Sequence, residues 1–176
     1  DKYLENTQHM HHPYYMGHQV SSPHPASAIA DLIHGVVNNP MAVYEMGPAA
    51  ATIEKIIINW MLEKIAWFKA DKLSETDNQK IKGGGILTHG GSLANLTCLL
   101  AARANADPEA WTKGVSKELV LLCPEVSHYS VARAVSIMGM GSDAIIPIKV
   151  DKDELLIVED LKIKYHKAIK QGKRIM

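Results

Sequence analysis

Glycine and serine residues at positions 90–92 could bind a phosphate group. Gly90, Gly91 and Ser92 lie between a short apolar run and an apolar segment that predicts a helix. Glycine lets the backbone turn tightly and approach a ligand closely. The first amides of a helix have no partner within it, and the helix dipole favours an anion there. The alternative interpretation is an ordinary strand-to-helix turn in which Ser92 is only a helix cap.

Two other phosphate-binding motifs can be tested on the same stretch, and both fail. Gly85, Gly90 and Ser92 have the spacing of a P-loop, but Gly91 stands where that motif needs a lysine. The dinucleotide-binding fingerprint would need a glycine at position 88, where the chain has Thr88. The sequence therefore argues against nucleotide hydrolysis and against a dinucleotide cofactor.

A second candidate for chemistry is His128, which follows the apolar run 119–123. It would lie at the carboxyl end of a strand, where open α/β sheets bind their ligands. A neutral imidazole can stack on a heteroaromatic ring, form hydrogen bonds or transfer a proton. Considered alone, His128 is better explained as a cap or a surface residue. Together with the turn at 90–92 it predicts a crevice that both sites face.

A parallel sheet with helices would have to position these residues. The hydrophobic pattern predicts strands at 85–88, 119–123 and 144–150, with a further strand beginning near 174. Helices are expected at 26–37, around the apolar positions 53–68, and at 93–104, 129–138 and 158–170. The segment 93–104 is apolar on nearly every face, so that helix should be buried. The helix at 129–138 would have Ser127 as its N-cap and would end at Gly139. Residues 41–48 predict a loop, and residues 69–82 a polar, exposed segment. This alternation indicates an α/β fold.

Composition excludes several classes of protein. Lysine plus arginine equals aspartate plus glutamate, 19 of each, so charge gives no reason to expect nucleic acid or an anionic membrane as partner. No apolar run reaches the length of about 18 residues that a spanning helix needs. The two cysteines, Cys98 and Cys123, favour a reducing, cytoplasmic compartment and are expected to be buried thiols.

Histidines near the N-terminus and a group of aromatic residues invite functional interpretations that the pattern does not favour. The histidines have no cysteine or carboxylate at the spacing of a closed metal site, so we expect no metal there; they are His9, His11, His12, His18 and His24. Trp60, Trp67 and Phe68 fall on or beside an apolar helix face, so we expect them in a core rather than in a ligand platform.

Several motifs together resemble one enzyme family. They are His12-Pro-Tyr-Tyr15 with Gln19, Tyr44-Glu-Met-Gly-Pro48, Ile53-Glu54, Thr88-His-Gly-Gly-Ser-Leu-Ala-Asn-Leu96, Ala101-Ala-Arg103 and Ser127-His-Tyr-Ser130. In order and spacing they resemble the group II pyridoxal-phosphate (PLP) dependent amino-acid decarboxylases, most closely the glutamate-decarboxylase-like branch. The resemblance covers essentially the whole chain.

The resemblance implies a fold and an organisation. The chain would be part of the large domain of the fold type I PLP-dependent enzymes, a mainly parallel sheet with helices on both faces, preceded by a helical N-terminal arm. Residues 1–48 would form the arm, and residues 49–176 the first part of the PLP-binding domain. The chain would then belong to a longer protein, and a homodimer is expected.

The resemblance also implies roles for named residues. Gly91 and Ser92 would bind the PLP phosphate, His128 would stack on the pyridine ring and take part in proton transfer, and Asn95 would support the phosphate turn. Gln19, Tyr14 and Tyr15 would contact the substrate. The lysine that carries the cofactor would lie outside this chain.

The implied reaction is decarboxylation of an L-amino acid of the glutamate, aspartate or diaminobutyrate type. Two alternatives stay open on the sequence. One is another fold type I PLP enzyme, a lyase or an aminotransferase, because a fold does not fix its chemistry. The other is a non-catalytic module that binds phosphate or PLP.

Overall fold

The computed structural model describes residues 2–67 and 83–176. The chain forms two compact units, Asp1–Gly84 and Gly85–Met176. The predicted boundary between residues 48 and 49 falls inside the first unit, and the division of roles at that boundary stays a prediction. The polar segment expected at 69–82 and Phe68 lie outside the described residues.

The first unit is helical. It contains α1 (Lys2–Glu5), α2 (Pro25–Val37), a 3-10 turn η1 (Tyr44–Met46) and α3 (Pro48–Lys64). Pro25 occupies the first turn of α2, and the His24 side chain accepts a hydrogen bond from the Ala26 amide. Asn38 ends the helix in the left-handed conformation, with φ of 49°. The helix predicted at 26–37 is confirmed, and the loop predicted at 41–48 contains the short turn η1.

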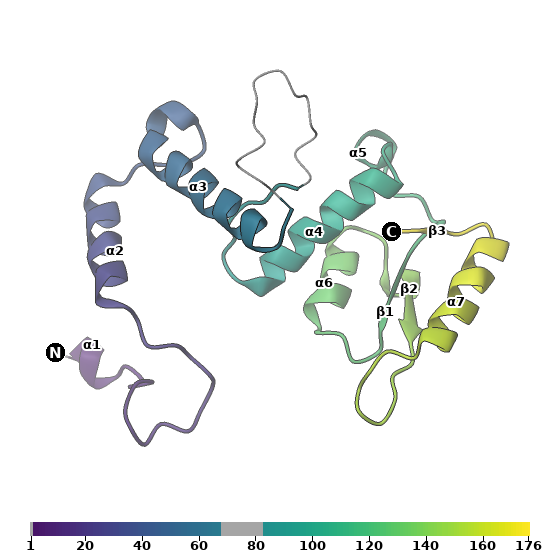
Figure 1. Cartoon of the computed structure of the whole chain (residues 1–176), viewed down its shortest axis with the longest axis horizontal. Helices are drawn as coiled ribbons and strands as arrows, with labels where there is room; N and C mark the ends of the chain where they lie inside the picture. The colour runs from purple at the N-terminus through teal and green to yellow at the C-terminus, as the bar shows by residue number, and fades with distance from the viewer. Residues whose placement is uncertain (1, 68–82) are drawn as a thin grey trace. The chain divides into compact units, whose positions relative to one another are not determined.

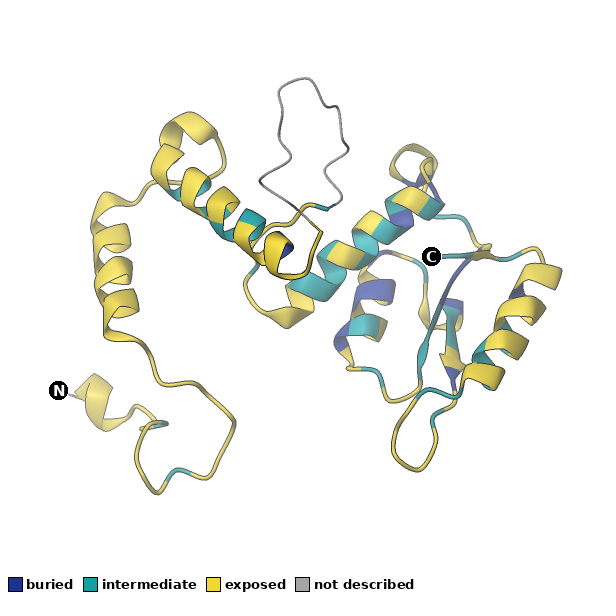
Figure 2. Ribbon diagram, in the orientation of Figure 1, coloured by how far each residue is buried: buried dark blue, intermediate teal, exposed yellow. Residues whose placement is uncertain are grey.

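The apolar stripe of α3 is largely exposed within its unit (Figure 2). Leu62 is the buried residue of this helix. Trp60 and Trp67 are each 55% exposed, so the prediction that they belong to a core is wrong for this unit. The physical reason is that the described residues of the unit form no second layer over the stripe, although its spacing is that of a packed helix face.

The second unit contains a parallel sheet. Its strands are β1 (Leu119–Pro124), β2 (Ile145–Ile148) and β3 (Arg174–Ile175), in the spatial order β2-β1-β3. Leu121 pairs with Ile145, and Leu119 pairs with Arg174. The predicted strands at 119–123, 144–150 and 174 are confirmed. The strand predicted at 144–150 ends at Ile148, and Val150 instead pairs with Leu156 in an antiparallel bridge.

Helices cover both faces of this sheet. The helices of this unit are α4 (Gly91–Ala106), α5 (Ala110–Lys113), α6 (Ser130–Ile137) and α7 (Val158–Lys170), with a 3-10 turn η3 (Ser142–Ala144) before β2. The chain passes from β1 through α6 to β2, and then returns through α7 to β3 on the other side of β1. Right-handed crossovers in opposite directions place their helices on opposite faces, as Figure 1 shows for α6 and α7. The predicted α/β fold is confirmed.

The core lies between β1, α4 and α6. Leu121, Val135, Met138 and Ala144 form its buried centre, with Leu96, Leu99 and Leu100 of α4 packed against it. Val135 has no exposed surface. Each buried side chain of this size contributes about 1.5–3 kcal/mol. This packing fixes α4 against α6, the two helices on which the candidate site depends.

Three predictions about this unit are wrong. Residues 85–88 are not a strand, and the described sheet consists of β1, β2 and β3, because an apolar run becomes a strand only where the fold aligns it with the ladder of a sheet. The helix at 93–104 exists, but it is not buried on every face; Leu93 is 43% exposed, because α4 packs against α6 by one side. Cys98 lies on the uncovered side and is exposed rather than a buried thiol, while Cys123 is half-buried.

Candidate functional site

The N-terminal end of α4 is open. Gly90 is the N-cap, with φ of 85° and ψ of 165°, a conformation that favours glycine. The helix begins at Gly91, and no side chain caps it. A Cβ atom added to Gly90 or Gly91 would have no atom within 4 Å. Ser92 is the second helical residue rather than the cap, so its interpretation as a simple cap is wrong, and its side chain is exposed.

A hollow lies beside this end of α4. His89 and Ser92 line it from the turn and α4, and Ser130 and Arg133 line it from α6. The remaining lining is apolar: Leu93, Leu96, Ala134 and Ile137. The open amides of α4 and the start of α6 therefore share one depression in the surface.

His128 lies where the sequence predicts, between the carboxyl end of β1 and the first turn of α6. Its Nδ1 accepts a hydrogen bond from the backbone amide of Ser130 at 3.2 Å. The N-cap position of α6 is Tyr129, which makes no side-chain cap bond. The prediction that Ser127 caps this helix is wrong, because the His128 ring receives the free amide instead.

A chain of hydrogen bonds links α4 to His128. The side-chain amide of Asn95 donates to the Ser130 hydroxyl at 2.8 Å. That hydroxyl lies 2.8 Å from Nδ1 of His128. Ser130 is only 2% exposed. No role was predicted for Ser130 from the sequence. A hydroxyl two residues after a histidine at the start of a helix can bond to the histidine ring, and this spacing could have indicated the contact.

Aromatic packing also holds the imidazole. The rings of His128 and Tyr129 lie 4.2 Å apart between centroids, at 37° to each other. The guanidinium of Arg133 lies over the Tyr129 ring, 4.7 Å from its centroid. The ring of His128 is therefore restrained at its edge by hydrogen bonds and on its face by an aromatic neighbour.

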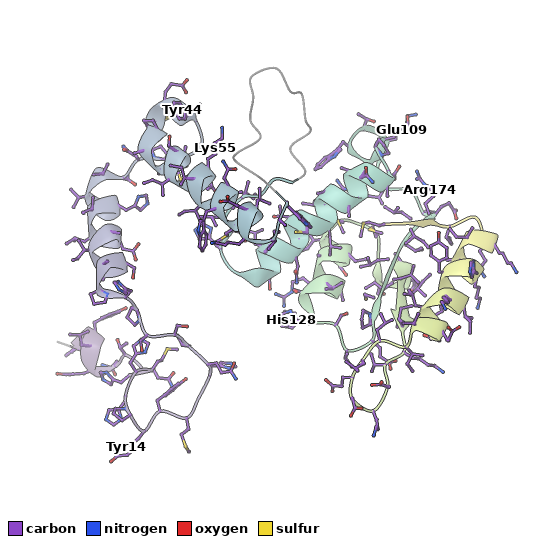
Figure 3. All side chains as sticks on the ribbon, viewed as in Figure 1. Tyr14, Tyr44, Lys55, Glu109, His128 and Arg174 are labelled. Carbon is purple, nitrogen blue, oxygen red and sulfur yellow. The ribbon has the colours of Figure 1, made fainter. Side chains whose placement is uncertain are left out.

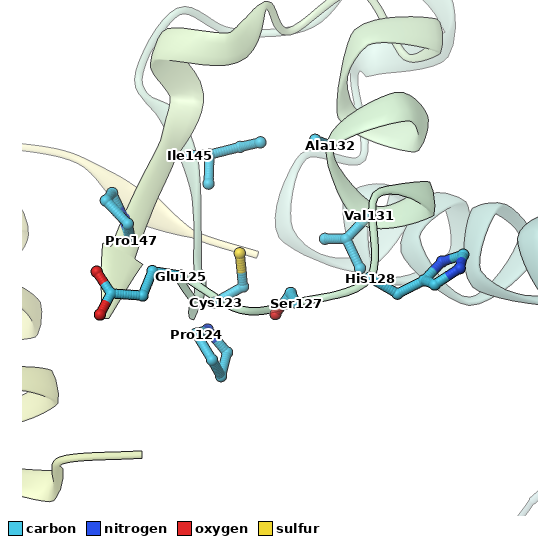
Figure 4. Close-up of a pocket in the computed structure, with 9 residues that line it drawn as sticks. All are labelled: Cys123, Pro124, Glu125, Ser127, His128, Val131, Ala132, Ile145 and Pro147. Atoms are coloured by element: carbon cyan, nitrogen blue, oxygen red, sulfur yellow. The ribbon is translucent and has the colours of Figure 1, made fainter. Parts of the chain in front are cut away.

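A second hollow lies at the carboxyl end of β1 (Figure 4). The Glu125 amide donates to the Ile148 carbonyl at 2.9 Å, and the Glu125 carboxylate accepts from the Val150 amide at 3.3 Å. These bonds hold the loop after β1 to the end of β2. The hollow is lined by Cys123, Pro124, Glu125, Ser127, His128, Val131, Ala132, Ile145 and Pro147.

The residues predicted to contact substrate all lie in the first unit. Tyr14 is 88% exposed (labelled in Figure 3). Tyr15 is half-buried and lies over Gly17, where any Cβ would collide with its ring. Gln19 is exposed. Their role in substrate binding stays a prediction. In the second unit Asn95 is linked to His128 through Ser130, whereas Ser92 and His128 line two different hollows, so the single crevice expected for the turn at 90–92 and His128 stays a prediction.

Two carboxyl groups have perturbed pKa values, and neither belongs to this cluster. The Ser116 amide and the Arg174 guanidinium lower the pKa of Asp107. The Lys149 amide and the Lys164 ammonium likewise lower the pKa of Asp160. Both stay ionised as anchors of the fold. Among residues 2–67 and 83–176, no helix is long and apolar enough to cross a membrane, and no cluster of histidine, cysteine and acidic side chains could hold a metal ion.

Known proteins share this fold. The chain is similar in structure to mouse CSAD, with a TM-score of 0.75 and 22% identity over 89% of this chain and 31% of that one. A glutamate decarboxylase domain from Vibrio parahaemolyticus gives a TM-score of 0.71 and 24% identity, over 87% of this chain and 32% of that one. Oryza sativa TDC, solved with PLP and tryptamine, gives 0.71 and 21%, over 89% of this chain and 32% of that one.

Sequence comparison gives the family. A glutamate decarboxylase-like protein of Gibberella zeae is 30% identical over 163 residues, which is 92% of this chain and 29% of that protein. The chain thus spans about a third of the length of the relatives it matches. The conserved domain of pyridoxal-dependent decarboxylases matches residues 3–176. The chain therefore belongs to the pyridoxal-dependent decarboxylase family.

Proposed function

We propose that the protein containing this chain is a PLP-dependent carboxy-lyase that removes the α-carboxylate of an L-amino acid. The observation that carries the proposal is the link between Asn95, one turn into α4 from its open end, and His128, made through Ser130. An anion site and a stacking, proton-bearing ring joined in this way suit a phosphorylated heteroaromatic cofactor. Membership of the family supports the same assignment.

The residues at the start of α4 fit a phosphate group. Gly90 and Gly91 leave open space where other residues would place a Cβ. The amides of the first turn have no helical acceptor, and the exposed Ser92 hydroxyl adds a donor. A phosphate dianion would thus meet several donors and the positive end of the helix dipole. Asn95 commits its amide nitrogen to Ser130, so its support of the phosphate turn would be indirect.

His128 would do two things beside the cofactor. Its ring would stack on the pyridine ring, and its Nε2 would hold a proton near the reacting carbon. When bound, PLP supplies an electron sink for the pair released as the bond from the α-carbon to the carboxylate breaks. Carbon dioxide leaves, and the α-carbon takes up a proton in its place. The chain's own contribution is to anchor, orient and protonate.

We place the substrate in the glutamate, aspartate or diaminobutyrate class, with Gln19, Tyr14 and Tyr15 as its contacts. The name of the fungal relative and the motifs near the N-terminus support this class. We further propose a homodimer, on the resemblance to the family, and a cytoplasmic location, on the low cysteine content.

The test uses the protein expressed at full length from its own gene. The protein is reduced with borohydride and its intact mass is measured, with an unreduced sample as control. We expect one covalent pyridoxyl-phosphate per chain. Release of labelled carbon dioxide is then measured with acidic and basic amino acids labelled in the carboxyl group. An adduct with amino-group exchange but no carbon dioxide would identify an aminotransferase. The absence of an adduct would identify a non-catalytic module, and either result would overturn the proposal.

A further inference from the structure

We infer that Asn95 and Ser130 are positioning residues that hold His128 in one neutral tautomer, with its proton on Nε2. This inference deepens the proposed function, on which the usefulness of that proton rests. The hydrogen bonds themselves are independent of any cofactor. They run from the Asn95 amide to the Ser130 hydroxyl, and from that hydroxyl to Nδ1 of His128.

One fixed donor sets the direction of the whole chain. The backbone amide of Ser130 points at Nδ1 of His128 at 3.2 Å, and a backbone N–H can only donate. Nδ1 must therefore be an acceptor without a proton. The Ser130 hydroxyl, 2.8 Å from the same atom, then has to donate its proton to Nδ1. Its oxygen is left to accept, and the Asn95 amide supplies that donor.

The other neutral tautomer fits poorly. A proton on Nδ1 would face the Ser130 amide, so that two donors would meet. The Ser130 hydroxyl would then have to accept from both Nδ1 and Asn95, and its own proton would need a new acceptor. Ser130 is 2% exposed, so water is not at hand to provide one. Unsatisfied donors in such a site are costly.

The surrounding elements keep the chain of bonds in place. Asn95 lies on α4 beside Leu96, and Ser130 begins α6, which carries the fully buried Val135. The two helices pack against each other through the core, so the distance between Asn95 and Ser130 is set by the fold. The Tyr129 ring, 4.2 Å from the imidazole centroid, restricts rotation of His128 about its side chain.

The result is an imidazole with a donor at its outer edge. Nε2 carries the proton, and no described residue makes a hydrogen bond to it. Figure 4 shows the ring directed away from Glu125 and Pro147, which lie across the hollow. A proton held at Nε2 is available to a bound ligand, whereas a proton at Nδ1 would be turned back into the protein. Asn95 and Ser130 thus act through His128 and need not touch the ligand.

The test reads the tautomer directly. The protein at full length is labelled with ¹⁵N-histidine, and the ring nitrogens of His128 are assigned by comparison with His128→Gln and observed at a pH where the ring is neutral. We expect the Nε2–H form to dominate. Ser130→Ala removes the hydroxyl donor and should lower the ratio of Nε2–H to Nδ1–H by about fivefold to tenfold, as expected for one hydrogen bond. Asn95→Asp should lower it further, because a carboxylate attracts the hydroxyl proton and leaves its oxygen to accept from Nδ1–H.

A matched control is Ser136→Ala on the same helix. Ser136 is exposed and its hydroxyl bonds only to the Ala132 carbonyl of α6, so the tautomer ratio should not change. A dominant Nδ1–H form, or equal spectra for Ser130→Ala and Ser136→Ala, would overturn the inference. If Ser130→Ala does not fold in a thermal melt, Asn95→Asp on the half-buried face of α4 decides alone.

Enzyme kinetics separate this inference from the proposed function. Ser130→Ala should lower kcat in proportion to the measured loss of the Nε2–H fraction and leave the affinity for PLP unchanged, because the phosphate donors on α4 are intact. The tautomer measurement needs neither cofactor nor activity. A protein that has the expected tautomer but forms no adduct and releases no carbon dioxide would refute the proposed function and leave the inference standing. A protein that forms the adduct and releases carbon dioxide but has its proton on Nδ1 would refute the inference and leave the proposed function standing.

Discussion

The two ends of α4 differ in whether their polar groups are exposed or are buried and bonded within the unit. At the N-terminal end, Gly90, Gly91 and Ser92 are exposed, and no side chain caps the helix. At the C-terminal end, Arg103 and Asp107 are 7% and 5% exposed, and Asp107 is held by several partners. The first end leaves its donors for a group from outside the unit. At the second end, the Asp107 carboxylate and the Arg174 guanidinium bond to other parts of the same unit.

The partners at the closed end come from well-separated parts of the unit. The Asp107 amide bonds to the Arg103 carbonyl at 2.7 Å, and its carboxylate accepts from the Ser116 amide at 2.9 Å and from Arg174 at 3.0 Å. Arg174, at the start of β3, also donates to the Ala106 carbonyl. Its charge suits the negative end of the α4 dipole. This end therefore ties α4 to the last strand of the described sheet.

The largest expected effect follows from removing the acceptor at the closed end. Asp107→Ala would leave Arg174 and the Ser116 amide without their partner beside the buried Arg103. We expect the largest loss of thermal stability among the variants considered, because a buried donor without its partner is costly. Differential scanning calorimetry of the full-length protein measures it. A change no larger than that of Glu109→Gln, discussed below, would refute the contrast between the two ends.

Acid should weaken the same end in a predictable direction. The pKa of Asp107 is lowered in the folded state, so its ionised form favours folding at any pH above its ordinary value of 3.8. That stability is lost as the pH falls through this value toward the lower folded pKa. Asp107→Asn should therefore be less stable than the wild type at pH 7, and should lose less on acidification. Urea midpoints along a pH series test it, and parallel curves for both proteins would count against this role.

Backbone strain at the open end gives the next effect. Gly90 has φ of 85° and ψ of 165°, where other residues are strained by about 1–3 kcal/mol. Gly90→Ala should cost that much in the free energy of unfolding, although its Cβ meets no atom within 4 Å. Gly91→Ala is the control, because Gly91 already has helical geometry and equal space. If urea denaturation gave the same loss in the free energy of unfolding for both variants, the positive φ of Gly90 would not be the reason for a glycine at this turn.

Removing the hydroxyl at the open end should affect binding instead of stability. Ser92→Ala deletes one proposed donor to the phosphate, and a hydrogen bond to a charged group is worth enough to weaken PLP binding by about tenfold. Because Ser92 is exposed and caps nothing, stability should change by less than about 0.5 kcal/mol. Fluorescence titration with PLP and a thermal melt of the same variant separate the two quantities. Unchanged affinity would remove Ser92 from the proposed site.

The sequence predicted what depends on neighbours in the chain. The helix ends at Asn38 and Gly139, and the helix at Val158–Lys170, follow from local backbone chemistry and hydrophobic period. His128 was found because strand ends and helix starts are local signals as well. The parallel arrangement followed from the alternation of strands and helices.

What the sequence did not predict depends on contacts made at a distance. Residues 85–88 have the composition of a strand, but composition does not decide which segments the fold aligns in the sheet. Cys98 and Trp60 are apolar by type, yet their exposure depends on whether another layer covers them. The local bond from Ser130 to His128 could have been predicted, but the bond from Asn95 to Ser130 joins residues 35 positions apart in the chain, and no local pattern predicts it.

The smallest effect is expected for an ion pair a short way along the chain from Asp107. Glu109 and Lys113 lie on the turn of α5, 2.6 Å apart at positions i and i+4, and are 66% and 69% exposed (Figure 3 labels Glu109 and Arg174). Glu109→Gln should cost less than about 0.5 kcal/mol, and added salt should abolish the difference, because water screens exposed charges. Urea denaturation at low and high salt measures both. Glu109 and Asp107 carry the same charge near the C-terminal end of α4. A large loss of stability for Glu109→Gln that persists at high salt would therefore mean that negative charge alone stabilises this end. The burial of Asp107 and its fixed partners would then not be the cause.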